Sequence, residues 1–181
     1  MSAGATLPGM DFAIKQLPSA DIDELGPLWK QLLAHHSQQA PHLGELAPVR
    51  SPESSWRLRR ELYLEWLSSP DTAALTARGP HGLLGYAMVR VVVDRPGSWQ
   101  WGAEPGDRVG VLETLVVHDD ARGAGVGQAL LDAARRHLDR HGLKIMKISV
   151  IAGNEGALRF YRREGAVDFV QTLVMPLTPP S

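Results

Sequence analysis

The sequence predicts one α/β domain in which a mixed sheet is flanked by helices. Three observations predict this class. The chain has 181 residues and is 44% hydrophobic, which is enough for one substantial core. Its periodic stretches follow one another as a strand, two helices, three strands, a helix, a strand, a helix and a terminal strand. A glycine-rich turn stands in the middle of that order, between a strand and a helix.

The beginning of the chain is small and contains glycine, so we expect a flexible N-terminus over residues 1–11. A single domain is expected to span residues 12–177. Its first strand is predicted at residues 12–17, where apolar and polar residues alternate weakly, and Pro18 ends it.

Two helices are predicted next. Asp21 is the expected cap of the first helix, which runs toward His36. After a connection that contains two prolines and a glycine, Pro52 takes the first position of the second helix, which continues through Trp66. Ser51 is its expected cap, because a hydroxyl oxygen can accept a hydrogen bond from a free N–H of the first turn.

Three strands follow in sequence. Residues 71–78 read as the first of them, and residues 83–93 form a longer one. Residues 94–107 contain proline, glycine and two tryptophans, and they make the longest interruption. The third strand is predicted at residues 109–117, an almost entirely apolar run.

The last third of the chain alternates between helix and strand. A helix is predicted at residues 126–141, with Gly142 as its C-terminal cap. A strand at 144–151 and a helix at 154–164 come next. One or two closing strands are expected within residues 167–177.

Composition excludes several classes of function. A formal net charge of -1 argues against a general nucleic-acid binder. The absence of cysteine excludes disulfides, thiolate metal sites and a cysteine nucleophile. No apolar stretch approaches a membrane span and no signal-like start is present, so we expect a cytoplasmic protein with no membrane partner. Two arginine clusters are interpreted as solvated helix faces rather than phosphate patches: Arg57, Arg59 and Arg60, and Arg135, Arg136 and Arg140.

The turn at residues 122–127, Arg-Gly-Ala-Gly-Val-Gly, is the most informative segment of the chain. A glycine-rich turn that opens a helix presents free N–H groups and the positive end of the helix dipole, a combination that binds phosphate. A Walker-type loop is excluded because no lysine or hydroxyl residue follows Gly127. The dinucleotide fingerprint is excluded because Gln128 replaces its third glycine, and Lys144 and Lys147 replace its acidic residue. A tight strand-to-helix connection without a ligand is the alternative.

What remains is Arg-x-x-Gly-x-Gly at Arg122, Gly125 and Gly127. This spacing resembles the pyrophosphate loop of the GNAT superfamily of N-acetyltransferases, which bind acetyl-coenzyme A (acetyl-CoA). A side chain at Gly125 or Gly127 is expected to obstruct close approach of the ligand or a positive φ.

A second segment strengthens the resemblance. Residues 154–165 resemble the other coenzyme-binding segment of the family, Asn-x-x-Ala-x-x-x-Tyr followed by glycine. From the residues alone, Asn154 could be only a helix cap and Tyr161 only a core aromatic. Because the segment comes one strand after the glycine-rich turn, we favour the coenzyme interpretation. The matching order of elements covers about residues 12–177.

The resemblance implies a GNAT-like mixed, mostly antiparallel sheet with a splayed central strand pair, and acetyl-CoA as co-substrate without a metal. Free backbone groups of Leu115 and Val117 would pair with the pantetheine arm. Arg122 would stand at the entrance of the loop, and Asn154 is assigned to the coenzyme site. The implied pyrophosphate contacts are the main-chain amides of Gly123, Ala124, Gly125, Val126, Gly127 and Gln128.

The implied reaction is direct attack of a primary amine on the thioester carbonyl. The pKa of an alkylamine is about 10.4, so the amine arrives protonated and a base is needed. Glu113 is the candidate because it is a charged residue within an apolar strand. A salt-bridged or edge-facing Glu113 is the alternative interpretation, and His118 is an alternative base. Tyr161 is assigned as the acid, since its family counterpart points its hydroxyl toward the coenzyme sulfur. An N–H near Leu115 would stabilise the oxyanion.

The acceptor is expected to be a small-molecule primary amine. A peptide or protein amine, and a non-catalytic module that binds acyl-CoA, remain as alternatives, and the sequence leaves open the acyl length and a homodimer. No metal is expected, because the histidines at 35, 36 and 42 lack metal-site spacing. The candidate acceptor-binding residues are His36, Tyr63, Trp99 and Trp101. Three further tryptophans are interpreted as packing residues: Trp29, Trp56 and Trp66.

Overall fold

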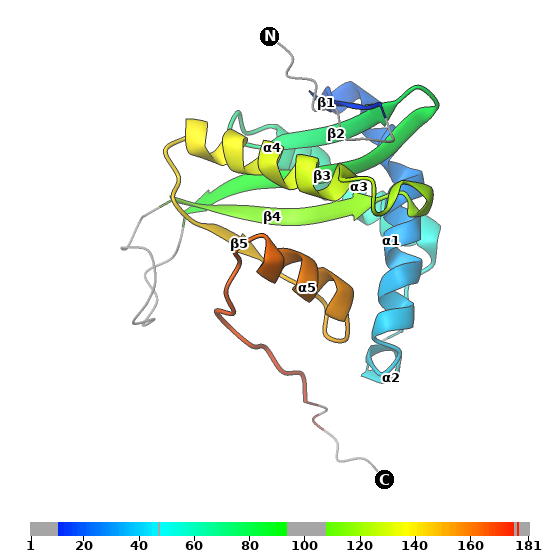
Figure 1. Cartoon of the computed structure of the whole chain (residues 1–181). Helices are drawn as coiled ribbons and strands as arrows, with labels where there is room; N and C mark the ends of the chain where they lie inside the picture. Colours follow the sequence, from blue (N-terminus) through cyan, green and yellow to red (C-terminus); the bar gives the residue numbers. More distant parts are fainter. Residues whose placement is uncertain (1–10, 47, 94–107, 176, 178–181) are drawn as a thin grey trace.

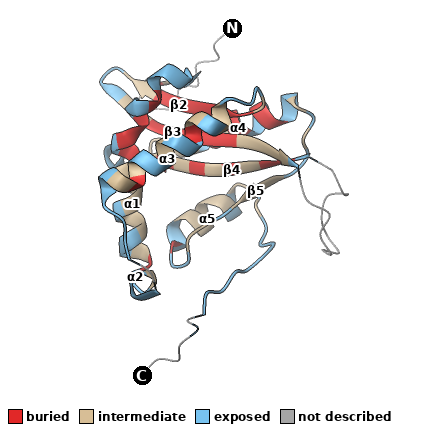
Figure 2. Ribbon diagram, turned by 180° about the vertical axis from the view of Figure 1, so that it is seen from behind, coloured by how far each residue is buried: buried red, intermediate tan, exposed pale blue. Residues whose placement is uncertain are grey.

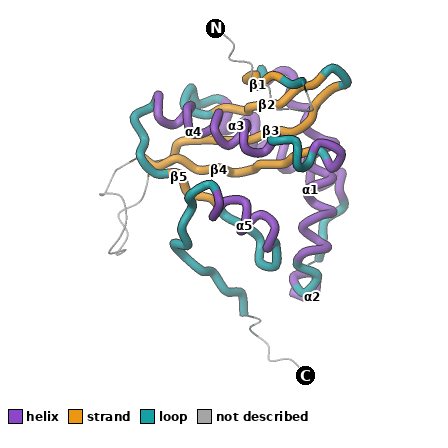
Figure 3. Tube along the Cα trace, in the orientation of Figure 1, coloured by secondary structure: helices purple, strands orange, loops and turns teal. Residues whose placement is uncertain are grey.

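The computed structural model describes residues 11–46, 48–93, 108–175 and 177 (Figure 1). The strands are β1 (Ala13–Gln16), β2 (Ala73–Gly79), β3 (Gly82–Val93), β4 (Arg108–Val117) and β5 (Met146–Ile148). The α-helices are α1 (Gly26–Gln39), α2 (Leu43–Leu46), α3 (Pro52–Leu67), α4 (Val126–Arg140) and α5 (Glu155–Arg163). Two 3-10 helices join them, η1 (Ser19–Leu25) and η2 (Asp119–Ala121). Figure 3 shows these classes along the chain.

The strands form one sheet in the order β1-β2-β3-β4-β5. The first four strands are antiparallel neighbours, and β5 runs parallel to β4 after the crossover through α4. The predicted mixed, mostly antiparallel sheet is thus confirmed. β4 and β5 pair only between Gly110–Leu112 and Met146–Ile148. Beyond Leu112 the described part of the chain places no strand beside β4 on this side, so the two strands part and leave a gap.

Helices cover both faces of the sheet, and each face has its own core (Figure 2). On one face, α4 buries Leu130 and Ala134 against the central strands. On the other face, η1, α1 and α3 pack over the sheet, and Tyr63 of α3 meets Tyr86 and Met88 of β3. The sheet therefore separates an α4 face from an α1–α3 face, and the edge of β4 that β5 leaves unpaired lies between them.

Most helix ends follow the sequence prediction, with one correction. The Ser51 side chain accepts a hydrogen bond from the N–H of Ser54 at 3.2 Å, which confirms it as the cap of α3. Asp21 does not cap α1, because it lies in η1 and α1 begins at Gly26. Pro27 explains the later start: proline has no N–H and is accepted in the first turn of an α-helix but not in its interior.

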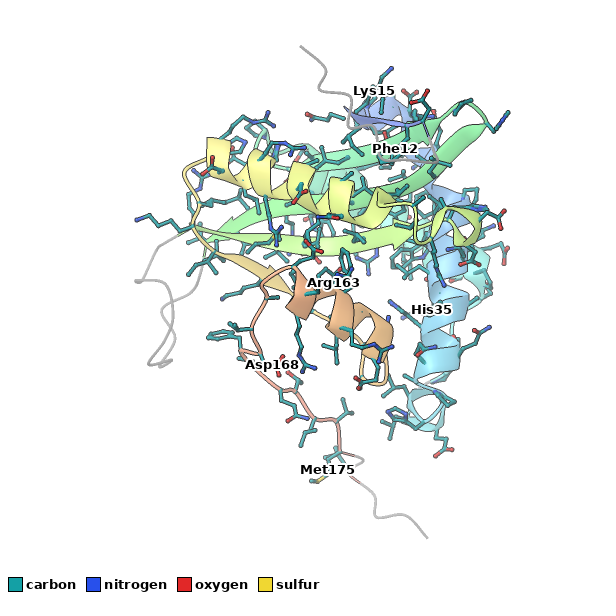
Figure 4. All side chains as sticks on the ribbon, viewed as in Figure 1. Phe12, Lys15, His35, Arg163, Asp168 and Met175 are labelled. Atoms are coloured by element: carbon teal, nitrogen blue, oxygen red, sulfur yellow. The ribbon has the colours of Figure 1, made fainter. Side chains whose placement is uncertain are left out.

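The predicted closing strands are wrong for the described residues. The segment 166–175 contains no strand and runs away from the sheet, with Met175 far out along it (Figure 4). Arg162 fixes the start of this segment through an ion pair with Asp168 at 2.8 Å. β5 is also shorter than the predicted 144–151. Apolar alternation favours a strand, but a ladder forms only where a neighbouring strand takes the backbone hydrogen bonds.

Candidate active site

The glycine-rich turn leaves main-chain donors free at the start of α4. Gly123 and Gly125 both have φ of 79°, a left-handed conformation that side chains disfavour. Gly125 is the N-cap of α4 and has no side chain with which to cap it. The N–H groups of Val126, Gly127 and Gln128 therefore lack an acceptor within the helix and lie at the positive end of its dipole. This geometry suits an anionic ligand.

Gly127 differs from the prediction. It lies in the first turn of α4, and it is not among the residues with a positive φ. A Cβ atom at Gly127 would meet side chains of Val117 at 3.5 Å and Phe160 at 3.7 Å, which are ordinary contacts. Backbone strain therefore does not require glycine at this position, and close approach of a ligand stays the prediction for Gly127.

Arg122 lies at the entrance of the turn, where it forms an ion pair. Its guanidinium is 2.8 Å from the carboxylate of Asp119, and 52% of its side chain is exposed. Both charges face solvent, so the pair contributes little to stability. An incoming phosphate can compete with Asp119 for this guanidinium.

The edge of β4 beside the gap directs backbone groups away from β3 at two positions, and one of these groups, the Val117 carbonyl, already has a side-chain partner. The N–H of His118 donates to the carbonyl of Leu84, and in an antiparallel ladder this direction alternates from one residue to the next. Leu115 and Val117 consequently direct their N–H and C=O groups away from β3 and into the gap. The side-chain amide of Gln31, on α1, donates to the Val117 carbonyl at 3.0 Å.

Helix α5 brings Tyr161 toward the same gap. Asn154 caps α5 through its side-chain oxygen, which accepts from the N–H of Ala157 at 3.1 Å. Asn154 is 9% exposed, so the cap is buried. Tyr161 packs against the core of the α4 face, and burial raises the pKa of its hydroxyl to about 12. The phenol is therefore neutral and carries a proton at physiological pH.

Glu113 is placed by an irregularity in β4. The β3–β4 register passes from Thr114 opposite Met88 to Leu112 opposite Val89, so Glu113 is the extra residue of a bulge. Its carboxylate accepts a hydrogen bond from Arg90 at 2.5 Å, and 19% of the side chain is exposed.

The structure confirms the salt-bridged interpretation of Glu113, and its role as the base stays a prediction. The carboxylate is salt-bridged, as the alternative interpretation expects, and it lies partly exposed at the beginning of the gap. The Arg90 guanidinium in turn stacks on the Trp66 ring at 4.5 Å. This arrangement holds the Glu113 carboxylate in place on the α1–α3 face through a charge-assisted hydrogen bond.

A buried hydroxyl network lies next to this ion pair. The Tyr63 hydroxyl is 2.6 Å from the Thr114 hydroxyl and 3.3 Å from that of Tyr86. Burial raises the pKa values of both tyrosines, so both remain neutral. Tyr63 was a predicted acceptor-binding residue. It is fully buried, so it can support the neighbouring side chains but does not itself line the surface of the candidate site.

Arg59 was missed by the sequence interpretation. Arg57 is exposed and Arg60 pairs with Asp23, as a solvated face would require. Arg59 instead lies over the Trp29 ring at 4.3 Å. A signal was present in the sequence: four residues share the spacing of one helical face, namely Trp56, Arg59, Tyr63 and Trp66.

The remaining predicted residues are placed as follows. His36 is partly buried, and its pKa is lowered by burial first and then by the charges of His35 and Arg59. His118 is exposed and accepts from the N–H of Asp120, so it caps the turn after β4. Trp99 and Trp101 lie outside the described residues. Within the described ranges, no three His, Asp or Glu residues gather as metal ligands, and no helix has the length and hydropathy to cross a membrane.

Comparison with known sequences identifies relatives of this chain. Residues 29–166 match the model of the family described as Acetyltransferase (GNAT) family. A mycothiol acetyltransferase from Cellulomonas flavigena is 30% identical over 158 residues, which cover 87% of this chain and 40% of that protein. A second one, from Propionibacterium freudenreichii subsp. shermanii, is 27% identical over 80% of this chain and 39% of that protein. The chain thus spans about 40% of the length of these curated relatives.

Solved structures share the fold. A GCN5-related N-acetyltransferase from Ralstonia eutropha JMP134 superposes with a TM-score of 0.69 at 15% identity, covering 92% of this chain and 98% of that one. An aminoglycoside N-acetyltransferase in complex with CoA gives a TM-score of 0.65 at 18% identity, covering 94% and 98%. At such identities the likeness shows the fold alone.

Proposed function

The chain belongs to the GNAT acetyltransferase family, and we propose that it transfers the acetyl group of acetyl-CoA to the primary amine of a small molecule. One observation carries this proposal. The free N–H groups at the start of α4 and the unpaired backbone of β4 adjoin one gap in the sheet, with Glu113 on one face and Tyr161 on the other.

The coenzyme is assigned to the gap. Its diphosphate would accept from the N–H groups around Gly125 and at the start of α4, and Arg122 would add a charge at the entrance. Its pantetheine amides would pair with Leu115 and Val117. In this binding mode the main chain holds the coenzyme. Asn154 is assigned to the same site because its buried cap fixes the start of α5 beside the gap.

The reaction is direct transfer. Glu113 takes a proton from the protonated amine, directly or through one water, and later passes it to solvent. The neutral nitrogen attacks the thioester carbonyl to form a C–N bond, and it then loses one further proton to solvent. The N–H of Leu115 stabilises the oxyanion. The C–S bond then breaks, and the Tyr161 hydroxyl protonates the leaving sulfur before it regains a proton from solvent. The products are an N-acetylated amine and free CoA thiol.

A small-molecule acceptor agrees with the relatives. The similar proteins include enzymes named mycothiol acetyltransferase and aminoglycoside N-acetyltransferase, both named for small molecules. His36 remains our proposal for an acceptor-side residue because it lies partly buried beside Arg59 on the α1–α3 face.

The test is a panel of amines with acetyl-CoA, followed by release of free CoA thiol and mass analysis of the product. We expect thiol release that requires the amine and yields an acetamide. Calorimetry with acetyl-CoA and with ATP supplies the control, because ATP has phosphates but no pantetheine arm, and we expect tight binding only of acetyl-CoA. Binding of acetyl-CoA without turnover of any amine would contradict the enzymatic proposal and favour an acyl-CoA-binding module.

A further inference from the structure

Arg59 has an environment that other partly buried arginines of the described chain do not share. Four described arginines are partly buried: Arg59, Arg60, Arg78 and Arg90. Three of them have carboxylate partners, namely Arg60 with Asp23, Arg78 with Glu24 and Arg90 with Glu113. Arg59 has no carboxylate partner among the described residues. A guanidinium withdrawn from water without an anion is costly, so its position calls for an explanation.

Aromatic rings hold the Arg59 guanidinium without using its hydrogen bonds. Its central carbon lies 4.3 Å from the centre of the Trp29 ring, 5.6 Å from Tyr63 and 5.8 Å from Trp66. Trp29 is itself fixed, because its indole N–H donates to Ser55 at 3.1 Å. Stacking of this kind leaves the N–H donors at the edge of the guanidinium, and no described residue accepts from them.

Among the described residues, the groups that interact electrostatically with Arg59 or with Tyr63 supply no unmatched negative charge. Tyr63 and Tyr86 are neutral hydroxyls, and His36 and His35 supply no anion. Glu113 is a carboxylate whose charge acts on Tyr63, and that charge is already matched by Arg90. The N–H donors of the Arg59 guanidinium therefore have no anionic partner among the described residues. They lie on the same face of the sheet as Glu113, the candidate base.

We propose that Arg59 binds an anionic group of the acceptor, so that the substrates are amines that also carry a carboxylate or a phosphate. This inference rests on the proposed function and specifies its substrate class. The amine would lie at Glu113 and the anion at Arg59, with the molecule crossing above Tyr63. A planar carboxylate accepts two parallel N–H bonds from the guanidinium edge, which a phosphate also permits.

The test compares matched amines: ω-amino acids of increasing chain length, their amides, and phosphoethanolamine against ethanolamine. For the unmodified enzyme we expect kcat/KM to favour the anionic member of each pair. Arg59→Gln should lower kcat/KM for that member by about 10- to 100-fold, the range expected for charge-assisted hydrogen bonds, and change the neutral member little. The carboxylate and phosphate arms show which anion the site takes.

Two variants separate anion binding from structure. Arg57→Gln removes an exposed guanidinium from the same helix and should leave both members unchanged. Arg59→Lys keeps the positive charge but loses the planar pair of N–H donors, so its kcat/KM should retain part of the preference for the anionic amine. Equal losses for anionic and neutral amines in Arg59→Gln, or no preference in the unmodified enzyme, would overturn the inference while leaving acetyl transfer intact.

A binding measurement tests the anion site even if the protein turns over no amine. Titration with a carboxylate such as 5-aminovalerate should shift the indole N–H resonance of Trp29 in the unmodified protein and not in Arg59→Gln. If no amine is turned over but this shift occurs, the proposed function fails and the anion site stands. If no shift occurs at high concentration of either 5-aminovalerate or phosphoethanolamine, the anion site is excluded.

Discussion

On the α4 face, the proposed coenzyme region presents main-chain groups: the N–H groups at the start of α4 and the edge of β4 at Leu115 and Val117. On the α1–α3 face, the proposed acceptor region presents side chains: the Arg90–Glu113 ion pair and Arg59 on its aromatic support. The first region is built from two neighbouring stretches of chain. The second draws residues from α1, α3, β3 and β4.

The difference between the two regions lies in what a substitution can change. A main-chain site depends on glycine conformation and on a helix start. A side-chain site loses a ligand contact when one residue changes. We therefore expect substitutions to divide into those that affect the coenzyme and those that affect the acceptor, and four substitutions test this division.

Glu113→Gln should have the largest effect. It removes the base on the acceptor side, so kcat/KM should fall by about 100-fold or more, while the Kd for acetyl-CoA changes little. Stopped-flow thiol release and calorimetry measure the two quantities. Glu61→Gln, an exposed carboxylate on α3, is the control. A rate within a factor of about two of the unmodified enzyme would remove Glu113 as the base and leave the ion pair with a structural role.

Gly125→Ala should act on the coenzyme side. A left-handed conformation costs an L-residue roughly 1–2 kcal/mol, and the turn must shift its N–H groups to relieve it, so the Kd for acetyl-CoA should rise about tenfold. The acceptor KM should not change at saturating coenzyme. Gly156→Ala adds the same methyl in α5, where it meets only the Asn154 side chain at 3.7 Å, and should bind acetyl-CoA normally. Equal affinities of the two variants would argue against main-chain binding at the turn.

Tyr161→Phe should lower kcat several-fold and leave the Kd for acetyl-CoA nearly unchanged. The effect is moderate because a thiol with a pKa near about 8.5 leaves readily without an acid. Pre-steady-state thiol release measures it. Unchanged turnover would exclude Tyr161 as the acid.

The same variant gives a test of stability against pH. Burial raises the pKa of Tyr161 to about 12 in the folded protein, above the ordinary value of 10.0. The unfolded chain therefore loses this proton first, and the free energy of unfolding falls as the pH rises from about 10 to about 12. Tyr161→Phe should make this fall less steep, and Tyr63 and Tyr86 account for part of what remains. Identical slopes above pH of about 10 would contradict the burial of this hydroxyl.

Gln31→Ala should have the smallest effect and test the boundary between the regions. Gln31 comes from the acceptor side and bonds the Val117 carbonyl on the coenzyme side. Losing this bond should lower the free energy of unfolding by about 1 kcal/mol and weaken both substrates only slightly, because the end of β4 becomes looser. Chemical denaturation and both binding constants measure it. Gln38→Ala, exposed on α1, is the control, and an effect confined to one substrate would place Gln31 in that region alone.

The sequence predictions that the structure confirms rest on local features of the chain. The Ser51 and Asn154 caps and the glycine-rich turn depend on residues within a few positions of one another. Predictions that needed distant partners were less complete. The predicted closing strands, for instance, have no neighbouring strand among the described residues. The predicted start of α1 at Asp21 is wrong for a local reason, because Pro27 is accepted in the first turn of a helix but not in its interior.

The sequence by itself determined the family, the order of strands and helices, and the backbone turn at the start of α4, because glycines, caps and apolar periodicity act over short stretches of chain. The tertiary structure decided which side chains meet: it paired Glu113 with Arg90, joined Gln31 to Val117, and set Arg59 on Trp29. These contacts join different elements, so only the packing of helices on the sheet brings them within reach.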